Sequence, residues 1–298
     1  MKISVVITTK DRIDFLERAV LSIINNLRGE FFCDVVIVND GGVKPDLSYL
    51  SIPLSTNLKI INNPVSLGGN KARNQGVLAS DGDIIFFLDD DDVYTPEAIP
   101  DKLRVFEEYH DVALVYTGVQ FVMSDRLDVV IREKKPFNDS AITFERLLAC
   151  GNLIGPTSSV AVRRSALISA GLFDEQLSAM QDYELWLRII QHGAVKSDGG
   201  VNLIYTIHSS GTQVSSKFEK YISAADYISK KFKNDLEFNQ ANRAFWAEVY
   251  FRVALSCSHA SEMLKIRFAT KSLYCKPTLK ALVLFMPTRL LKIIKPFV

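Results

Sequence analysis

Residues 84–92 read Ile84-Ile85-Phe86-Phe87-Leu88-Asp89-Asp90-Asp91-Asp92, five apolar residues followed by four carboxylates. The continuous apolar run predicts a strand that is covered on both faces, as the strands of parallel sheets are. Four adjacent carboxylates repel one another, so an uncompensated cluster at the end of a buried strand is unfavourable. A divalent cation such as Mg²⁺ or Mn²⁺ relieves that repulsion and prefers oxygen ligands. The stretch therefore predicts a metal site at a strand end, with a solvated acidic turn as the alternative.

The segments before this stretch repeat the same order of apolar run and polar end. Strand-like runs cover residues 3–7, 34–38, 58–61 and 83–88, and helical spacing of apolar residues covers 15–27 and 68–79. Strands that alternate with helices predict a parallel sheet. Thr8-Thr9 and Asp40 follow two of these strands, and the carboxyl edge of an open α/β sheet is where ligands bind. The sequence thus predicts one ligand-binding edge.

The rest of the chain divides into strand-like and helical segments. Residues 112–121 are strand-like, 173–192 contain an acidic and aromatic helix, and 217–259 have helical composition without Gly or Pro. We expect an α/β domain over residues 1–215, in two halves of about 1–110 and 111–215. A helical extension with a basic amphipathic tail then covers residues 216–298.

Charge and composition limit the function classes. The 298 residues carry a net charge of +1, which argues against a nucleic-acid partner. Residues 263–298 hold eight Lys or Arg and no acid, whereas the remaining chain holds 27 basic and 34 acidic residues. No CxxC pair, signal peptide or apolar run of membrane-spanning length is present in the sequence. We therefore expect a cytoplasmic protein whose tail meets a polyanionic surface.

Two glycine-containing segments are weaker indicators of a nucleotide site. Asp40 precedes Gly41-Gly42, and a carboxylate at a strand end can accept hydrogen bonds from a base or ribose, although an Asp-Gly turn needs no ligand. Residues 68–74 (GGNKARN) place glycines before a helix that has basic residues in its first turns, which suits a phosphate. This segment lacks the spacing of a P-loop or of a GxGxxG motif.

Six of these segments resemble, in order, the motifs of family 2 glycosyltransferases with the GT-A fold. They are residues 4–12 (SVVITTKDR), 38–42 (VNDGG), 72–76 (ARNQG), 88–92 (LDDDD), 162–164 with 171–175 (VRR and GLFDE), and 181–186 (QDYELW). The resemblance covers about residues 3–210, and it implies that the half over about 1–110 binds the nucleotide sugar and that the half over about 111–215 binds the acceptor. It implies a Rossmann-like GT-A fold with a mostly parallel central sheet flanked by helices, followed here by the helical extension.

The resemblance also implies roles for individual residues. It places eight of them at the donor: Thr8, Thr9, Asp11, Asp40, Asn70, Arg73, Asp89 and Asp90. Thr8 and Asp40 match residues that hold the nucleobase, and Asp89 or Asp90 would face the ribose. Asp89 and Asp91 match the family's DxD motif, with Asp91 as the direct metal ligand and Mn²⁺ or Mg²⁺ as the cofactor.

Two further residues match functional positions beyond the donor motifs. Asp182 matches the general base of inverting members, and a carboxylate near an acceptor hydroxyl can remove its proton. The alternative for Asp182 is a helix N-terminal charge that the helix dipole favours. His208 follows a strand-like run and matches a metal-side histidine of some relatives, with a purely structural histidine as the alternative.

The implied reaction is inverting transfer of a sugar, from a UDP-sugar as the first expectation, to a hydroxyl of a saccharide acceptor. Cell-surface polysaccharide such as O-antigen, built on a lipid-linked acceptor, is the expected product. The Gln-x-x-Arg-Trp signature of processive synthases is absent from the sequence, which favours a single addition. The alternatives are a nucleotidyltransferase of related fold, against which the absence of Gly from residues 8–14 argues, and a non-catalytic sugar-binding relative.

The tail interleaves basic and apolar residues, and Pro287 divides it. Such segments can lie in an anionic membrane interface, so the tail predicts peripheral attachment to the inner face of the cell membrane. Packing on the body, or a contact in a homodimer, is the alternative.

Overall fold

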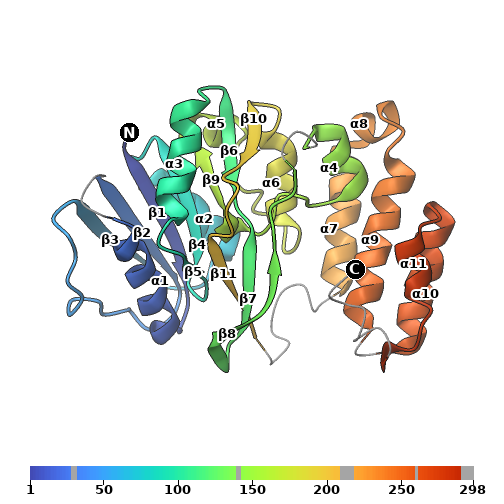
Figure 1. Cartoon of the computed structure of the whole chain (residues 1–298), viewed down its shortest axis with the longest axis horizontal. Coiled ribbons are helices and arrows are strands. Elements are labelled where there is room, and N and C mark those ends of the chain that lie inside the picture. The colour runs from blue at the N-terminus through green and yellow to red at the C-terminus, as the bar shows by residue number, and fades with distance from the viewer. Residues whose placement is uncertain (28–31, 139–141, 209–217, 259–260, 290–298) are drawn as a thin grey trace. The chain divides into compact units, whose positions relative to one another are not determined.

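The computed structural model describes residues 1–27, 32–138, 142–208, 218–258 and 261–289 (Figure 1). The chain forms two compact units. Unit 1 contains Met1–Ile142, Ile154–Glu175 and Leu185–Ser209, and unit 2 contains Thr143–Leu153, Gln176–Glu184 and Ser210–Val298. The domain division at residue 215 stays a prediction.

Unit 1 is built on a seven-stranded sheet, mostly parallel as predicted. Its order is β10 (Ala194–Ser197), β6 (Val112–Tyr116), β9 (Val160–Arg163), β4 (Ile84–Asp89), β1 (Ile3–Thr9), β2 (Cys33–Asp40) and β3 (Thr56–Asn63). Only β9 runs antiparallel to its neighbours β4 and β6 among these described strands. The carboxyl ends of β1, β2 and β4 therefore lie side by side, with Thr8 in register with both Val38 and Asp89.

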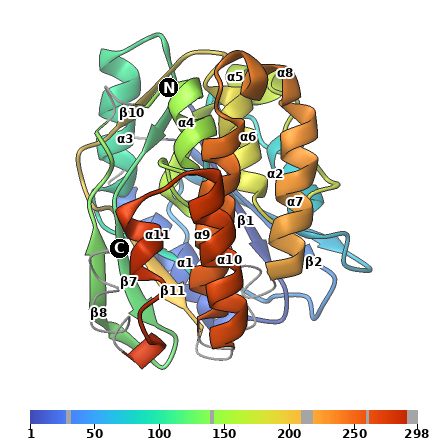
Figure 2. The same cartoon turned by 90° about the vertical axis from the view of Figure 1, so that its right-hand side faces the viewer.

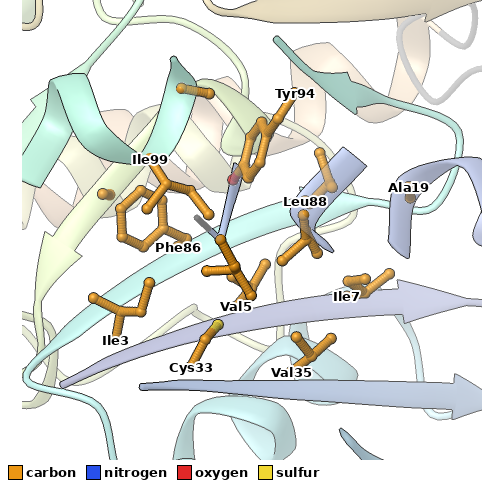
Figure 3. Close-up of a cluster of buried hydrophobic side chains, with 14 of the residues drawn as sticks. Ile3, Val5, Ile7, Ala19, Cys33, Val35, Phe86, Leu88, Tyr94 and Ile99 are labelled. Carbon is orange, nitrogen blue, oxygen red and sulfur yellow. The ribbon is translucent and has the colours of Figure 1, made fainter. Parts of the chain in front are cut away.

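Alternate residues of the central strands face opposite layers. Val5, Val35 and Phe86 belong to one core cluster (Figure 3), which also contains residues of α1 (Ile13–Asn26) and α3 (Ala98–Glu108). Val36 and Val38 pack with α2 (Gly69–Leu78) in a second cluster. Strands covered on both faces have to be apolar at every position, which is why the sequence shows continuous runs.

A second, four-stranded sheet was not predicted. Its order is β5 (Val93–Tyr94), β11 (Leu203–Ile207), β7 (Val119–Met123) and β8 (Arg126–Lys134). The strand-like run at 112–121 is divided between β6 of the first sheet and β7 of the second. The division falls at Gly118, where a Cβ atom would lie 2.7 Å from the carbonyl oxygen of Lys134 and 3.0 Å from that of Gly200. A glycine permits this close crossing of backbones.

The remaining helices of unit 1 are short. They are η2 (Thr157–Ser159) and α5 (Arg164–Ser169). Helix α6 (Gln181–Ile189) begins in unit 2 and ends in unit 1.

Unit 2 is helical, as predicted for the C-terminal region (Figure 2). Its helices are α4 (Phe144–Cys150), α7 (Phe218–Lys231), α8 (Lys233–Phe238), α9 (Asn242–Cys257), α10 (Glu262–Cys275) and α11 (Leu279–Val283). The buried Lys265 of α10 donates from Nζ to the carbonyl of Met286 at 2.7 Å and to Thr288 Oγ1 at 3.2 Å. The described part of the tail is therefore packed within unit 2. Among the described residues, no helix has the length and apolarity needed to cross a membrane.

Candidate active site

Four carboxylates follow one another at the end of β4, and each has its own environment. The backbone N–H of Asp92 donates to the carbonyl of Asp89 at 3.0 Å, so the chain turns directly after the strand. Asp90 and Asp92 are buried. The side chains of Asp89 and Asp91 keep 30% and 16% of their surface exposed. Two carboxylates of the cluster are therefore partly exposed, and two are buried.

Arg12, in the loop after β1, supplies positive charge to the cluster. Its Nε donates to Asp90 Oδ2 at 3.2 Å, and its Nη2 donates to Asp90 Oδ1. Its Nη1 donates to Asp91 Oδ2 at 2.7 Å. Thr9 adds a hydrogen bond from Oγ1 to Asp90 Oδ2 at 2.6 Å. The planar fork of the guanidinium thus spans two adjacent carboxylates, a geometry that a lysine does not offer.

The ionisation of Asp90 reflects this balance. Burial raises the pKa of Asp90 to about 6, although the charge of Arg12 and the hydrogen bond from Thr9 lower it. Burial also opposes the charge of Arg12, but the carboxylates of Asp90 and Asp91 outweigh it and raise the pKa of Arg12. The two groups hold each other in the charged form.

Asp92 is a structural member of the cluster. Its Oδ1 accepts a hydrogen bond from the backbone N–H of Thr206 in β11 at 3.0 Å. Burial, and then the charges of Asp91 and Asp89, raise the pKa of Asp92 well above its ordinary value. Asp92 therefore joins β4 to the second sheet and fixes the chain that carries Asp91.

Asp91 and His208 meet at one carboxylate oxygen. His208 Nε2 lies 2.9 Å from Asp91 Oδ2, the same oxygen that Arg12 contacts, and its ring packs edge-on against Phe15 with centroids 5.4 Å apart. Among the described residues, no group of three or more His, Cys, Asp or Glu side chains surrounds a single point. Mg²⁺ and similar hard cations usually take one or two carboxylates, substrate phosphates and waters. The pair of Asp91 and His208 fits such an open site.

Asp89 pairs with a different cation, Arg73 of helix α2. Arg73 Nη2 donates to Asp89 Oδ1 at 2.6 Å, and its guanidinium lies 5.6 Å from the centre of the Phe173 ring.

Two asparagines of α2 bind the backbone of a neighbouring loop. Asn70 Nδ2 donates to the carbonyl of Asp174 at 2.7 Å. Asn74 exchanges hydrogen bonds with the backbone of Phe173 at 2.9 and 3.0 Å. Helix α2 therefore links two of the predicted motifs, residues 72–76 and 171–175.

Asp40 organises the loop before α2. Its Oδ1 accepts from the backbone N–H of Leu67 at 2.8 Å, and its Oδ2 accepts from the N–H of Gly68 at 2.9 Å. Ser66 Oγ and Asn63 Nδ2 complete the set at 2.8 and 3.1 Å. Burial opposes the charge of Asp40, but these hydrogen bonds outweigh it and lower its pKa. The charged carboxylate thus shapes residues 66–68.

Asp11 holds the turn that follows β2. Its Oδ1 accepts from the backbone N–H of Val43 at 2.9 Å. A Cβ atom on Gly42 would lie 2.5 Å from the same oxygen, so any other residue there would force the Asp11 carboxylate to shift.

Asp182 lies in unit 2, in the first turn of α6. Its Oδ2 accepts from Asn152 Nδ2 at 3.0 Å, and its Oδ1 accepts from the backbone N–H of Tyr183 at 2.8 Å. The hydroxyl of Tyr183 donates to the carbonyl of Leu147 at 2.9 Å. These contacts hold the carboxylate in one orientation.

The structure brings most of the predicted donor and metal residues to the carboxyl edge of the sheet. It also places Arg12 there, which the sequence analysis did not single out as a site residue. A cation that follows a strand end in the same motif as Thr8 and Thr9 is the signal that could have found it. The sequence also did not single out Arg252, which lies near Asp182 in unit 2.

We predict that Arg12→Ala lowers the free energy of unfolding by about 1–3 kcal/mol. Removal of one partner from a fully buried ion pair costs about 3–5 kcal/mol, and the 40% exposure of the Arg12 side chain reduces this figure. Urea unfolding of the purified chain without added metal measures the change. Arg104→Ala, which removes the more exposed pair with Asp101, is the control and is expected to change the free energy by less than about 0.5 kcal/mol.

The double variant Arg12→Ala/Asp90→Asn separates charge compensation from packing. It should recover most of the lost stability, because no buried charge then lacks a partner. An Arg12→Ala variant as stable as the wild type, or a double variant no more stable than the single one, would contradict this interpretation.

Two proteins that are similar to this chain in sequence are both named as glycosyltransferases. The chain is 24% identical over 250 residues to the putative colanic acid biosynthesis glycosyl transferase WcaA of Escherichia coli, covering 82% of this chain and 85% of that protein. It is 28% identical over 163 residues to the amylovoran biosynthesis glycosyltransferase AmsE of Erwinia amylovora, covering 54% and 59%.

Solved structures share the fold at low identity. S. aureus TarS 1-349 in complex with UDP-GlcNAc superposes with a TM-score of 0.63 and 16% identity, over 96% of this chain and 89% of that one. The mannosyltransferase PcManGT from Pyrobaculum calidifontis, in complex with GDP-Man and Mn²⁺, gives 0.58 and 14%, over 99% and 81%. The model of the family "Glycosyl transferase family 2" matches residues 4–170, more than half of the chain. The chain is a glycosyltransferase and belongs to family 2.

Proposed function

We propose that this glycosyltransferase moves a sugar from a nucleotide diphosphate sugar to a saccharide hydroxyl with inversion, and that it requires Mn²⁺ or Mg²⁺. The observation that carries the proposal is the carboxylate oxygen Asp91 Oδ2. It belongs to a side chain that is 16% exposed, two residues after the end of β4, and it is contacted by both Arg12 and His208. Hard divalent ions prefer oxygen ligands and usually take one or two carboxylates together with substrate phosphates, and Asp91 offers such a carboxylate beside the histidine.

The donor would lie along the carboxyl ends of β1, β2 and β4. In this proposal Thr8 and Asp40 hold the base, the latter through the loop it shapes. Asp89 rather than Asp90 faces the ribose, because the side chain of Asp90 is fully buried. The loops around the donor are positioned by the contacts, described above, of Thr9, Asp11, Asn70 and Arg73. A UDP-sugar is the first candidate, and relatives of this fold carry UDP-GlcNAc or GDP-Man.

The metal would be held by Asp91 and His208, with Asp89 as a further candidate ligand. When bound, it would stabilise the negative charge of the departing diphosphate. Arg12 keeps the buried Asp90 neutralised, which leaves Asp91 as the carboxylate that faces the ligand.

Asp182 is the proposed general base. The acceptor hydroxyl oxygen attacks the anomeric carbon, the bond to the diphosphate oxygen breaks, and Asp182 takes the hydroxyl proton. The hydrogen bonds from Asn152 and from the N–H of Tyr183 fix the carboxylate for this transfer.

We further propose a role in the synthesis of a cell-surface polysaccharide, with a lipid-linked acceptor. Two relatives are named for colanic acid and amylovoran biosynthesis, which supports this setting. A nucleotidyltransferase would release pyrophosphate and a sugar-binding relative would release nothing, whereas the proposed enzyme releases a nucleoside diphosphate.

The tail would attach the protein to the inner face of an anionic membrane. Helix α10 carries Met263 and Tyr274 at exposures of 77% and 84%, and α11 carries Leu279 at 83% and Leu282 at 53%. Basic side chains are interspersed among them at Arg267, Lys271, Lys276 and Lys280. The last part of the predicted membrane segment, residues 290–298 with Lys292 and Lys295, lies outside the described residues.

We predict that Asp91→Asn abolishes the Mn²⁺-dependent part of nucleotide binding. A contact to a charged group contributes about 1.5–3 kcal/mol, so affinity for UDP in the presence of Mn²⁺ should fall at least about tenfold. Calorimetric titration of a panel of nucleoside diphosphates, with and without Mn²⁺, measures this. Asp81→Asn, an exposed carboxylate of unit 1, is the matched control. Unchanged Mn²⁺-dependent binding by Asp91→Asn would remove Asp91 as a ligand.

We predict that Asp182→Asn lowers turnover about 10²–10⁴-fold, the range expected for loss of a general base. Donor affinity should change little, since the amide retains the shape of the carboxylate. Release of nucleoside diphosphate in the presence of an acceptor gives the rate, and titration gives the affinity. An equal loss of both would instead identify Asp182 as a donor-site or structural residue.

We predict that Leu279→Glu/Leu282→Glu reduces binding to anionic liposomes by about tenfold or more. Each buried Leu contributes about 1.5–3 kcal/mol, and the introduced charges are repelled by the leaflet. Flotation at low salt measures binding, and Leu54→Glu, at a fully exposed Leu of unit 1, is the control. A wild-type chain that ignores anionic liposomes would make these residues a packing or dimer element.

A further inference from the structure

Unit 2 places a cationic group close to the proposed base Asp182. Helix α4 ends at Cys150, and the next two residues, Gly151 and Asn152, lead away from it. Asn152 donates to Asp182. Gly151 has a φ of +75°, and a Cβ atom there would lie 3.0 Å from Glu248 Cγ.

The same position on Gly151 would lie 3.6 Å from both Nε and Nη2 of Arg252. Glu248 and Arg252 are one turn apart on α9 and both lie beside Gly151. The next residue, Asn152, is the one that donates to Asp182. A Cβ atom at residue 151 would press on Glu248 and would be in ordinary van der Waals contact with Arg252. Arg252 therefore lies within contact range of the segment that leads to Asn152 and the candidate base.

The guanidinium of Arg252 has hydrogen-bonding capacity to spare. Its Nε donates to Glu248 Oε1 at 2.9 Å, and Lys280 pairs with the other oxygen of Glu248. Two cations therefore share one carboxylate. Within the described residues, Nη1 and Nη2 of Arg252 donate no hydrogen bond to protein, and 41% of the side chain is exposed.

The charges around Arg252 agree with this placement. Burial would lower its pKa, but Tyr221, Glu248 and Asp182 raise it, and the net shift is upward. Asp182 also contributes to the raised pKa of Tyr221, for which burial is the main cause. Within unit 2, electrostatic interactions thus connect Arg252, Tyr221 and Asp182.

We propose that Arg252 binds an anionic group of the acceptor, a phosphate or carboxylate, beside the hydroxyl that Asp182 deprotonates. This inference rests on the proposed function, because it takes Asp182 as the base. An arginine whose two Nη groups are available presents a planar fork that matches the oxygens of a phosphate or carboxylate. Asp182 would repel such a group, and Arg252 offsets that repulsion.

The test uses the full chain and ligand-observed NMR titration with three probes: glucose 1-phosphate, glucuronate and glucose. The phosphate probe stands for a linkage phosphate and glucuronate for an acidic sugar. We expect at least one anionic probe to bind about tenfold more tightly than glucose. Arg252→Gln should remove that preference and leave glucose binding unchanged. Arg126→Gln, at an exposed arginine of β8 and with the same change in charge, should retain the preference.

Arg252→Lys covers the case in which Arg252→Gln fails to fold, as judged by circular dichroism. It keeps the charge without the fork, and we expect an intermediate preference. Equal binding of glucose and both anions by the wild type, or an unchanged preference in the folded Arg252 variants, would overturn the inference. Failure to bind any nucleoside diphosphate would instead refute the proposed function, and the anion preference would still report on Arg252.

Discussion

The ion pair between the buried carboxylate of Asp90 and the guanidinium of Arg12 is the interaction on which the candidate site depends. Four carboxylates in sequence at the end of a buried strand would repel one another in a region of low dielectric. Arg12 neutralises the buried member and also contacts Asp91. The cluster can therefore lie at a strand end without unfolding it, while the side chain of Asp91 stays partly exposed.

This arrangement depends on the order of strands in the sheet. Because β1 lies between β4 and β2 and runs parallel to both, the loop after β1 meets the acid cluster on one side and the turn after β2 on the other. Arg12 pairs with the cluster, and Asp11 binds Val43 of the turn. Two adjacent residues of one loop thus connect three strand ends.

The sequence predicted the parts of this fold that follow from hydrophobic pattern. The continuous runs of β1, β2 and β4 and the helical spacing of α1 and α2 indicate burial directly. It did not predict the second sheet, because residues 112–121 read as one strand although the chain passes at Gly118 from β6 to β7. The separation of the four carboxylates into buried and exposed members also depends on partners distant in sequence, such as Thr206 for Asp92. The resemblance supplied Asp182 and His208, and their roles remain proposals.

In the site that we propose, the acid cluster binds a divalent metal through Asp91, while Arg12 neutralises Asp90. The most direct measurement is the anomalous scattering of manganese in crystals of the full chain grown with UDP and Mn²⁺. We expect a manganese peak about 2 Å from the Asp91 carboxylate, with Arg12 still paired to Asp90. A bound nucleotide whose manganese lies away from Asp91, or Arg12 displaced from Asp90, would contradict it.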